Sequence, residues 1–203
     1  KGLQIIDVRF PSSPIVVGFH NMLGDSQGIY VTGGYAYVAD GDSGLRIIDV
    51  SAPAAPIEVG YQEIVEPADV YVSDGYAYVA ASDYFDSGLR IIDVSNPAAP
   101  IEVAYQEIEG ATDVYVSGNY AYVADSGFFH PALRIIDVSN PAAPIEVGHQ
   151  TMSGTVQDVF VAGNYAYVGT FSGLGSYWDG LRIVDISNPA SPSEVGYYQM
   201  PWG

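Results

Sequence analysis

The sequence of 203 residues repeats itself every 42–48 residues, and this repeat constrains the fold more than any other feature. A hexapeptide of the type LRIIDV begins at Leu3, Leu45, Leu89, Leu133 and Leu181. The tetrapeptide YAYV begins at Tyr35, Tyr76, Tyr120 and Tyr165. A motif of the type PIEV begins at Pro14, Pro56, Pro100, Pro144 and Pro192. Such a period indicates one supersecondary unit that is copied along the chain.

Each unit contains four short segments rich in Val, Ile and Tyr, separated by Gly, Pro, Asn and Ser. We name them strands a (DVYV and its variants), b (YAYV), c (LRIIDV) and d (PIEV). Four strands in so short a unit, with no helical periodicity, are typical of a propeller blade. The sequence therefore predicts an all-β fold, a β-propeller of four-stranded antiparallel blades.

The number of strands predicts an incomplete ring. Residues 1–203 are expected to form a single propeller of about 4.5 blades. Residues 1–20 supply only strands c and d, and the full blades are expected at 25–63, 64–107, 108–151 and 152–200. A closed ring needs every blade to be complete. We therefore expect this segment to be part of a longer chain, or a neighbouring subunit to supply the open edge.

The segment LRIIDVSNPAAPIEVG, at residues 133–148, resembles the repeat of LVIVD-repeat proteins, and related segments cover the whole chain. This bacterial and archaeal family contains many exported or surface-associated proteins. The resemblance implies a propeller scaffold located outside the cell or at its surface. It implies no catalytic residues, because the family shares none that can be transferred to this sequence.

The charge balance excludes several classes of partner. Twenty-four Asp and Glu residues against six Lys and Arg give a net charge of −18, which repels nucleic acid. No apolar run approaches the roughly 20 residues that a membrane-spanning helix needs, so membrane insertion is not expected. The absence of cysteine rules out disulfides and thiolate chemistry.

Insertions concentrate on one face of the expected propeller. From the first Tyr of strand b to the first Leu of strand c, successive blades have 10, 13, 13 and 16 residues, whereas the rest of the repeat stays at 31 or 32. Fourteen of the 24 acidic residues lie in or beside the loops of this face. Exposed aromatic rings beside carboxylates suit carbohydrate stacking or a basic protein partner. The candidate binding residues are Asp83, Tyr84, Phe85, Asp86, Phe128, Phe129, Phe171, Tyr177, Trp178 and Asp179. Surface acidity that serves only solubility is the alternative.

Metal and catalytic signals are weak in this sequence. Asp40 and Asp42, in DGDSG, are candidate calcium ligands, but the loop lacks the spacing and terminal Glu of an EF-hand, so a solvated turn is the alternative. No other cofactor is expected. No nucleophile elbow is present and the three histidines do not converge, so no catalytic residue is assigned.

Two charged patterns recur once per blade. Asp69, Asp113 and Asp158 precede strand a near the expected channel, where they could hold a cation or accept hydrogen bonds from loop amides. The second pattern predicts an ion-pair ladder between the Arg and the Asp of strand c, with Arg46, Arg90, Arg134 and Arg182 pairing with Asp49, Asp93, Asp137 and Asp185.

These patterns together predict a non-catalytic extracellular or cell-surface scaffold. It would bind a protein or a carbohydrate through its acidic, aromatic loop face. Two alternatives remain open. One is a structural subunit of a larger surface assembly. The other is a metal-dependent hydrolase or lyase that uses the channel, which would require carboxylates or histidines converging on a pocket.

Overall fold

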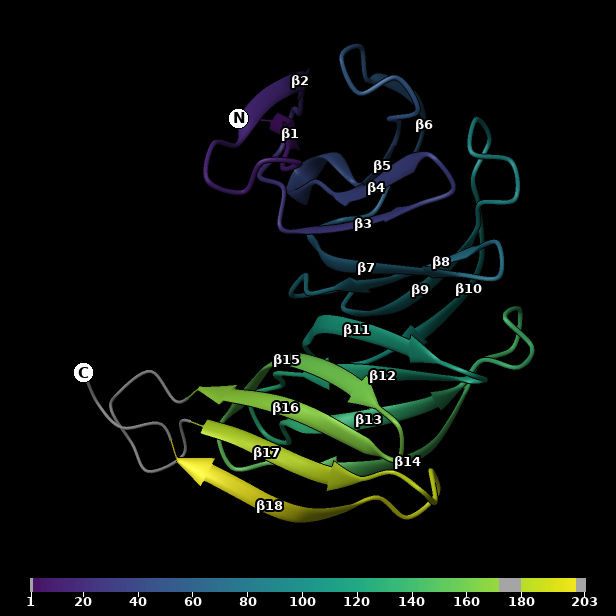
Figure 1. Cartoon of the computed structure of the whole chain (residues 1–203). Helices are drawn as coiled ribbons and strands as arrows, with labels where there is room; N and C mark the ends of the chain where they lie inside the picture. Colours follow the sequence, from purple (N-terminus) through teal and green to yellow (C-terminus); the bar gives the residue numbers. More distant parts are fainter. Residues whose placement is uncertain (1, 172–179, 200–203) are drawn as a thin grey trace.

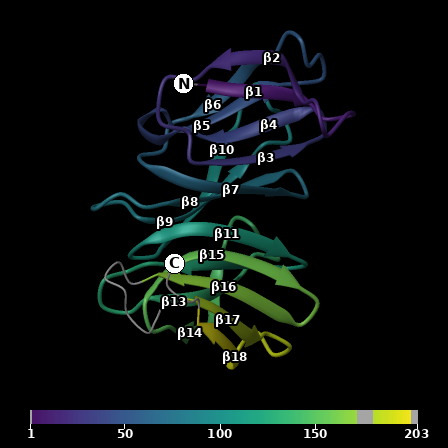
Figure 2. The same ribbon diagram turned by 60° about the vertical axis from the view of Figure 1, so that its left-hand side comes forward.

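The computed structural model describes residues 2–171 and 180–199 and confirms the predicted all-β propeller architecture. Four sheets have four strands each and a fifth has two, and all pairings are antiparallel. The sheets follow one another in chain order along an arc (Figure 1), from the purple N-terminal pair to the yellow β18. The view turned by 60° shows the same succession (Figure 2).

The strands coincide with the sequence motifs. The half blade contains β1 (Gly2–Asp7) and β2 (Ile15–Asn21). Blade 1 contains β3 (Gly28–Thr32), β4 (Tyr35–Ala39), β5 (Leu45–Asp49) and β6 (Ile57–Gln62). Blade 2 contains β7 (Pro67–Ser73), β8 (Tyr76–Ala81), β9 (Gly88–Asp93) and β10 (Ile101–Glu107). Blade 3 contains β11 (Ala111–Ser117), β12 (Tyr120–Asp125), β13 (Ala132–Asp137) and β14 (Ile145–Thr151). Blade 4 contains β15 (Thr155–Ala162), β16 (Tyr165–Phe171), β17 (Gly180–Asp185) and β18 (Ser193–Gln199). The only helix among the described residues is a short 3-10 turn at Gly41–Ser43, so none of them forms a helix able to span a membrane.

The hydrophobic core is a series of seams between neighbouring sheets. The two faces of strand b enter different seams because strand side chains alternate. In β8, Ala77 and Val79 pack towards blade 1, whereas Tyr78 and Ala80 pack towards blade 3. Sheets buried on both faces explain why strands b and c read as nearly continuous apolar runs.

Glycines in strand d let the next blade approach closely. A Cβ atom at Gly60 would lie 2.1 Å from the carbonyl oxygen of Pro97, and one at Gly148 would lie 2.3 Å from that of Pro189. Both prolines belong to the c–d turn of the following blade. At these two positions glycine is needed for the next blade to pack closely, whereas blade 2 has Ala104 at the corresponding position of strand d.

The recurring arginines form ion pairs, but the predicted partner was wrong. Each arginine of strand c pairs with the glutamate of strand d in the same blade, at 2.8–3.2 Å. The pairs are Arg46–Glu58, Arg90–Glu102, Arg134–Glu146 and Arg182–Glu194. Residues three apart on a strand point to opposite faces, so the Asp of strand c cannot reach the Arg. Instead Asp49, Asp93, Asp137 and Asp185 each accept a hydrogen bond from the backbone N–H of the serine two residues later.

Candidate binding surface on the loop face

The antiparallel order places the b–c and d–a connections at one end of every blade. We call this end the loop face. Its b–c loops span residues 40–44, 82–87 and 126–131, and its d–a loops span 22–27, 63–66, 108–110 and 152–154. The a–b and c–d turns lie at the opposite end, which we call the turn face.

Two aromatic pairs project from the b–c loops of blades 2 and 3. Tyr84 and Phe85 are 90% and 89% exposed, and their rings meet edge to face at 4.8 Å. Phe128 and Phe129 are 87% and 73% exposed and meet edge to face at 5.2 Å. Large apolar side chains clustered at this exposure typically mark an interaction surface.

A groove of about 540 Å³ separates the two b–c loops. Its lining combines residues from both loops and from the d–a loop between them, namely Ser82, Asp83, Tyr84, Glu109, Gly110, Ser126, Gly127 and Phe128. The structure therefore brings three of the predicted binding residues, Asp83, Tyr84 and Phe128, to one site.

The remaining predicted binding residues have different positions. Asp86 forms an ion pair with Arg90, at the base of the same loop as Tyr84. Phe171 is about half exposed at the end of β16. Tyr177, Trp178 and Asp179 lie outside the described residues.

Hydrogen bonds hold the two aromatic loops. In blade 2, Asp83 Oδ2 accepts a hydrogen bond from the N–H of Phe85 at 2.9 Å, and Ser87 Oγ donates to the carbonyl of Ala81 at 3.0 Å. In blade 3, the fully buried Asp125 accepts from the N–H of Gly127 at 2.9 Å and from Arg134 Nε at 2.5 Å. Each loop is thus fixed by its own set of contacts.

The candidate calcium ligands make hydrogen bonds within the protein. Asp40 is fully buried, and its two carboxylate oxygens accept from the N–H of Gly24 at 2.9 Å and from Ser26 Oγ at 2.6 Å. A hydrogen bond with Asp42 raises the pKa of Glu66. Within the described ranges, no three His, Asp or Glu side chains are grouped so that they could hold a metal ion. Calcium binding at Asp40 and Asp42 stays a prediction.

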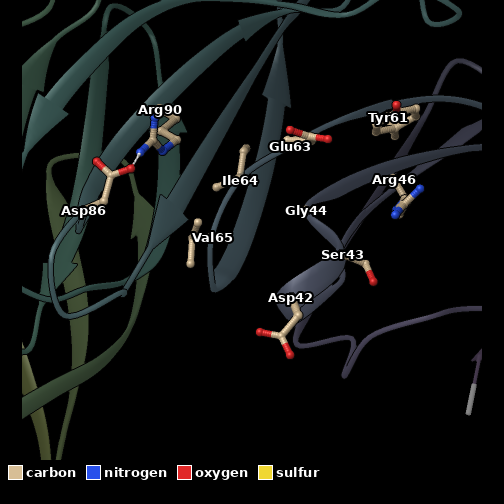
Figure 3. Close-up of a pocket in the computed structure, with 10 residues that line it drawn as sticks. All are labelled: Asp42, Ser43, Gly44, Arg46, Tyr61, Glu63, Ile64, Val65, Asp86 and Arg90. Atoms are coloured by element: carbon tan, nitrogen blue, oxygen red, sulfur yellow. Dashed lines mark hydrogen bonds and ion pairs between the residues drawn. The ribbon is translucent and has the colours of Figure 1, made fainter.

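A second pocket, of about 500 Å³, lies between blades 1 and 2. Figure 3 shows Arg90 directed at Asp86 on one side of this pocket and Arg46 near Tyr61 on the other. The guanidinium of Arg46 lies 5.0 Å from the ring centre of Tyr61. Each arginine also pairs with a strand d glutamate, so neither offers an unpaired cation to an anionic ligand.

Strand a is the innermost strand of each blade, and the a strands of neighbouring blades lie side by side. These inner strands carry a row of carboxylates. Asp69 Oδ2 accepts from the N–H of Val114 at 3.3 Å, and Asp113 Oδ2 accepts from the N–H of Val159 at 2.6 Å. The donors are amides of strand a in the next blade, whereas the sequence suggested loop amides. Burial, followed by the hydrogen bond with Asp69, raises the pKa of Asp113 to about 9.

An aromatic row runs beside these carboxylates and was missed from the sequence. The rings of Tyr30, Tyr71, Tyr115 and Phe160 meet in succession at 4.5, 4.9 and 5.2 Å between centres. The recurring aromatic residue of strand a was the available signal. The row lines the inner strands and links neighbouring blades.

A protein-family model for the LVIVD repeat matches residues 1–21, 23–62, 67–105, 110–151 and 153–200. The chain belongs to the LVIVD-repeat family. This result confirms the resemblance seen in the repeats. No curated protein matches the LVIVD chain at a significant level.

Solved structures similar to the LVIVD chain share its fold at low sequence identity. A protein of unknown function from Desulfotomaculum acetoxidans has a TM-score of 0.74 and 15% identity, over 98% of this chain and 63% of that one. Kuenenia stuttgartiensis hydrazine synthase gives 0.75 and 15%, over 96% and 59%. A periplasmic gluconolactonase from Pseudomonas aeruginosa gives 0.78 and 13%, over 98% and 63%. The LVIVD chain spans about three fifths of the length of these proteins, and the likeness shows the fold alone.

Proposed function

We propose that this chain is a non-catalytic propeller scaffold that binds a protein or a carbohydrate through its loop face. The observation that carries the proposal is the acidic groove flanked by the exposed pairs Tyr84–Phe85 and Phe128–Phe129. Aromatic side chains supply large contact areas with little conformational freedom to lose, and they concentrate in binding surfaces. The extracellular or surface location remains part of this proposal, because it rests on the family resemblance.

The test compares binding by the wild type and a loop variant in which Tyr84, Phe85, Phe128 and Phe129 are replaced by serine. Both proteins are applied to a glycan array and a peptide array. We expect the loop variant to lose about tenfold or more in affinity for whichever class the wild type binds. Phe10→Ser is the matched control, because Phe10 is 73% exposed but lies in the half blade's c–d turn on the turn face. Wild-type binding that survives in the loop variant, or no binding to either array, would refute the proposal.

The channel alternative receives less support from the geometry. Gluconolactonase and hydrazine synthase show that similar folds occur in enzymes, but the likeness does not extend to a site. The inner carboxylates Asp69 and Asp113 bond to backbone amides of the next blade, so they contribute to the seams between blades. This use favours the scaffold over a metal-dependent hydrolase or lyase.

The outer side of blade 4 supports a second proposal, that another blade packs there. Among the described residues, the nearest atoms to a Cβ at Gly196 would belong to Ile183 of its own blade, at 3.5 Å and beyond, whereas its counterparts Gly60 and Gly148 contact a proline of the following blade. The blade would come from the rest of a longer chain or from a neighbouring subunit. Sedimentation velocity distinguishes these sources, because a neighbouring subunit requires self-association that Gly196→Val weakens.

A further inference from the structure

The groove between blades 2 and 3 is lined by an aromatic residue from each b–c loop and by two glycines. Tyr84 and Phe128 form the walls, and Gly110 and Gly127 lie between them. A Cβ atom at residue 110 would lie 2.7 Å from Ser126 Oγ, and one at residue 127 would lie 2.8 Å from Glu109 Oε2. Glycine at both positions therefore lets the Ser126 hydroxyl and the Glu109 carboxylate lie close to the backbone of the groove.

The groove carries negative charge and no compensating cation. Asp83 and Glu109 line it, and none of its lining residues is Lys or Arg. The nearby Arg90 and Arg134 each pair with two carboxylates. With a net charge of −18 on the chain, this surface attracts cationic ligands over a distance set by ionic strength.

The chain itself shows which cation suits such a lining. In blades 1, 2 and 4, an arginine of strand c stacks on the tyrosine of strand d and pairs with a glutamate. The guanidinium carbons of Arg46, Arg90 and Arg182 lie 5.0, 4.7 and 4.6 Å from the ring centres of Tyr61, Tyr105 and Tyr197. The groove supplies the other two components, an aromatic ring and a carboxylate, without the arginine.

A neutral sugar fits this lining less well than an arginine does. Carboxylates only accept hydrogen bonds, and the side-chain donors in the lining are the hydroxyls of Ser82, Ser126 and Tyr84. Sugar oxygens would therefore find few donors. A guanidinium is planar, donates only, and stacks on aromatic faces, so it satisfies the rings and the carboxylates together.

We propose that the groove between Tyr84 and Phe128 binds arginine side chains of an extended basic segment in a partner protein. The inference rests on the proposed binding function of the loop face and specifies its ligand. The guanidinium lies against a groove ring, while Asp83 and Glu109 accept its hydrogen bonds. Because attraction over long distances contributes, affinity falls as salt concentration rises.

The experiment measures fluorescence anisotropy with labelled peptides of alternating Gly and Arg, and with matched peptides in which citrulline replaces every Arg. Citrulline keeps the shape of arginine but is neutral. We expect the arginine peptide to bind the wild type about tenfold or more tightly than the citrulline peptide, and more weakly at high salt. Tyr84→Ser/Phe128→Ser and Asp83→Asn/Glu109→Gln should each weaken the arginine peptide about tenfold.

The matched charge control is Asp49→Asn/Asp74→Asn, which removes two charges at the opposite end of the blades, on the turn face. It should leave the affinity for the arginine peptide within about twofold of the wild type, because distant exposed charges are screened. Equal weakening by this control and by Asp83→Asn/Glu109→Gln would overturn recognition in the groove. Circular dichroism verifies that every variant is folded.

A neutral oligosaccharide, cellohexaose, distinguishes failure of the arginine inference from failure of the proposed binding function of the loop face. If cellohexaose binds through Tyr84 and Phe128 while the arginine peptide does not bind, the loop face is a binding surface and the arginine inference is wrong. Equal affinity for the citrulline and arginine peptides likewise overturns it. If neither probe binds in a way that depends on the aromatic loops, both the inference and the proposed function fail.

Discussion

The turn face and the loop face of this propeller are stabilised in different ways. On the turn face, the same contact recurs in every full blade: a strand c aspartate accepts the N–H of the serine two residues later, at 2.8–2.9 Å. Hydrogen bonding with the side chain of that serine, followed by the bond from its N–H, lowers the pKa of all four aspartates. On the loop face, the second residue after YAYV differs between blades. It is Asp40, Ala81, Asp125 or Thr170, and the contacts differ with it.

Packing between blades restrains the turn face more than the loop face. The c–d turns of blades 1, 2 and 4 fit against a glycine of the preceding blade, so their shape cannot vary without opening the seam. The b–c loops of blades 2 and 3 extend beyond the seams, where exposed side chains such as Tyr84 and Phe128 pack on no neighbouring blade. Insertions and binding residues can therefore accumulate there.

The largest expected effect comes from disturbing the contact between a strand d glycine and the c–d turn of the next blade. Gly148→Val forces a β-branched side chain against the Pro189 carbonyl, so blades 3 and 4 must separate. We expect a loss of about 3 kcal/mol in the free energy of unfolding. Urea denaturation followed by tryptophan and tyrosine fluorescence measures the change.

Gly196→Val is the control for this prediction. Its nearest contacts are Ile183 side-chain atoms at 3.5 Å or more, so the cost should stay below about 0.5 kcal/mol in a monomeric sample. Similar losses for both variants would mean that the glycine acts through strand conformation and not through the neighbouring blade. The two faces would then differ for another reason.

The fold was predictable because the same local pattern occurs in every repeat. Five motifs of the LRIIDV type and four copies of YAYV made the strand order unambiguous, and Val, Ile and Ala on both faces signalled sheets that are buried on both sides. The error over Asp49 shows the limit of counting recurrences. The partner of Arg46 depends on cross-strand register, including the bulge between Ile47 and Ile48 that places Glu58 opposite Ile48.

The loop face was predictable only in part. The sequence placed Tyr84 and Phe128 in variable loops, and the structure adds that they border one groove with Glu109. The sequence itself gave no sign that Asp40 and Asp125 are fully buried. The burial of each carboxylate depends on amide donors in an irregular loop. Such contacts have no periodic signature.

A smaller effect, of opposite sign, is expected at the start of strand a. Asp113→Asn keeps an acceptor for the N–H of Val159 and can donate to the neighbouring carboxylates of Asp69 and Asp158. It also removes the cost of keeping a buried carboxyl protonated at pH 7, where the unfolded chain has already released the proton. We expect a stabilisation at pH 7 of about 1 kcal/mol, or about 2–4 °C in Tm.

The pH dependence follows from the raised pKa of Asp113, which is about 9 in the folded chain. The unfolded chain releases this proton near pH 4, so the stabilising contribution is complete below that pH and disappears as pH rises towards 9. The Tm difference between Asp113→Asn and the wild type should therefore grow from pH 5 to pH 8. Asp137→Asn, at an exposed carboxylate with a lowered pKa, should show no such growth. A difference for Asp113→Asn that does not vary with pH would contradict the buried, protonated carboxyl.

The smallest expected effect tests whether a loop-face acid is a metal ligand or a structural acceptor. Calcium needs six or more oxygens, and both carboxylate oxygens of Asp40 already accept hydrogen bonds from Gly24 and Ser26. Because a ligand specific to the folded chain must raise its stability, about 5 mM CaCl2 should shift Tm by less than about 1 °C. Differential scanning calorimetry with matched NaCl measures the shift. A rise of several degrees that Asp42→Asn abolishes would establish a calcium site, and would show that this part of the loop face is held by a metal ion rather than by the hydrogen bonds of Asp40.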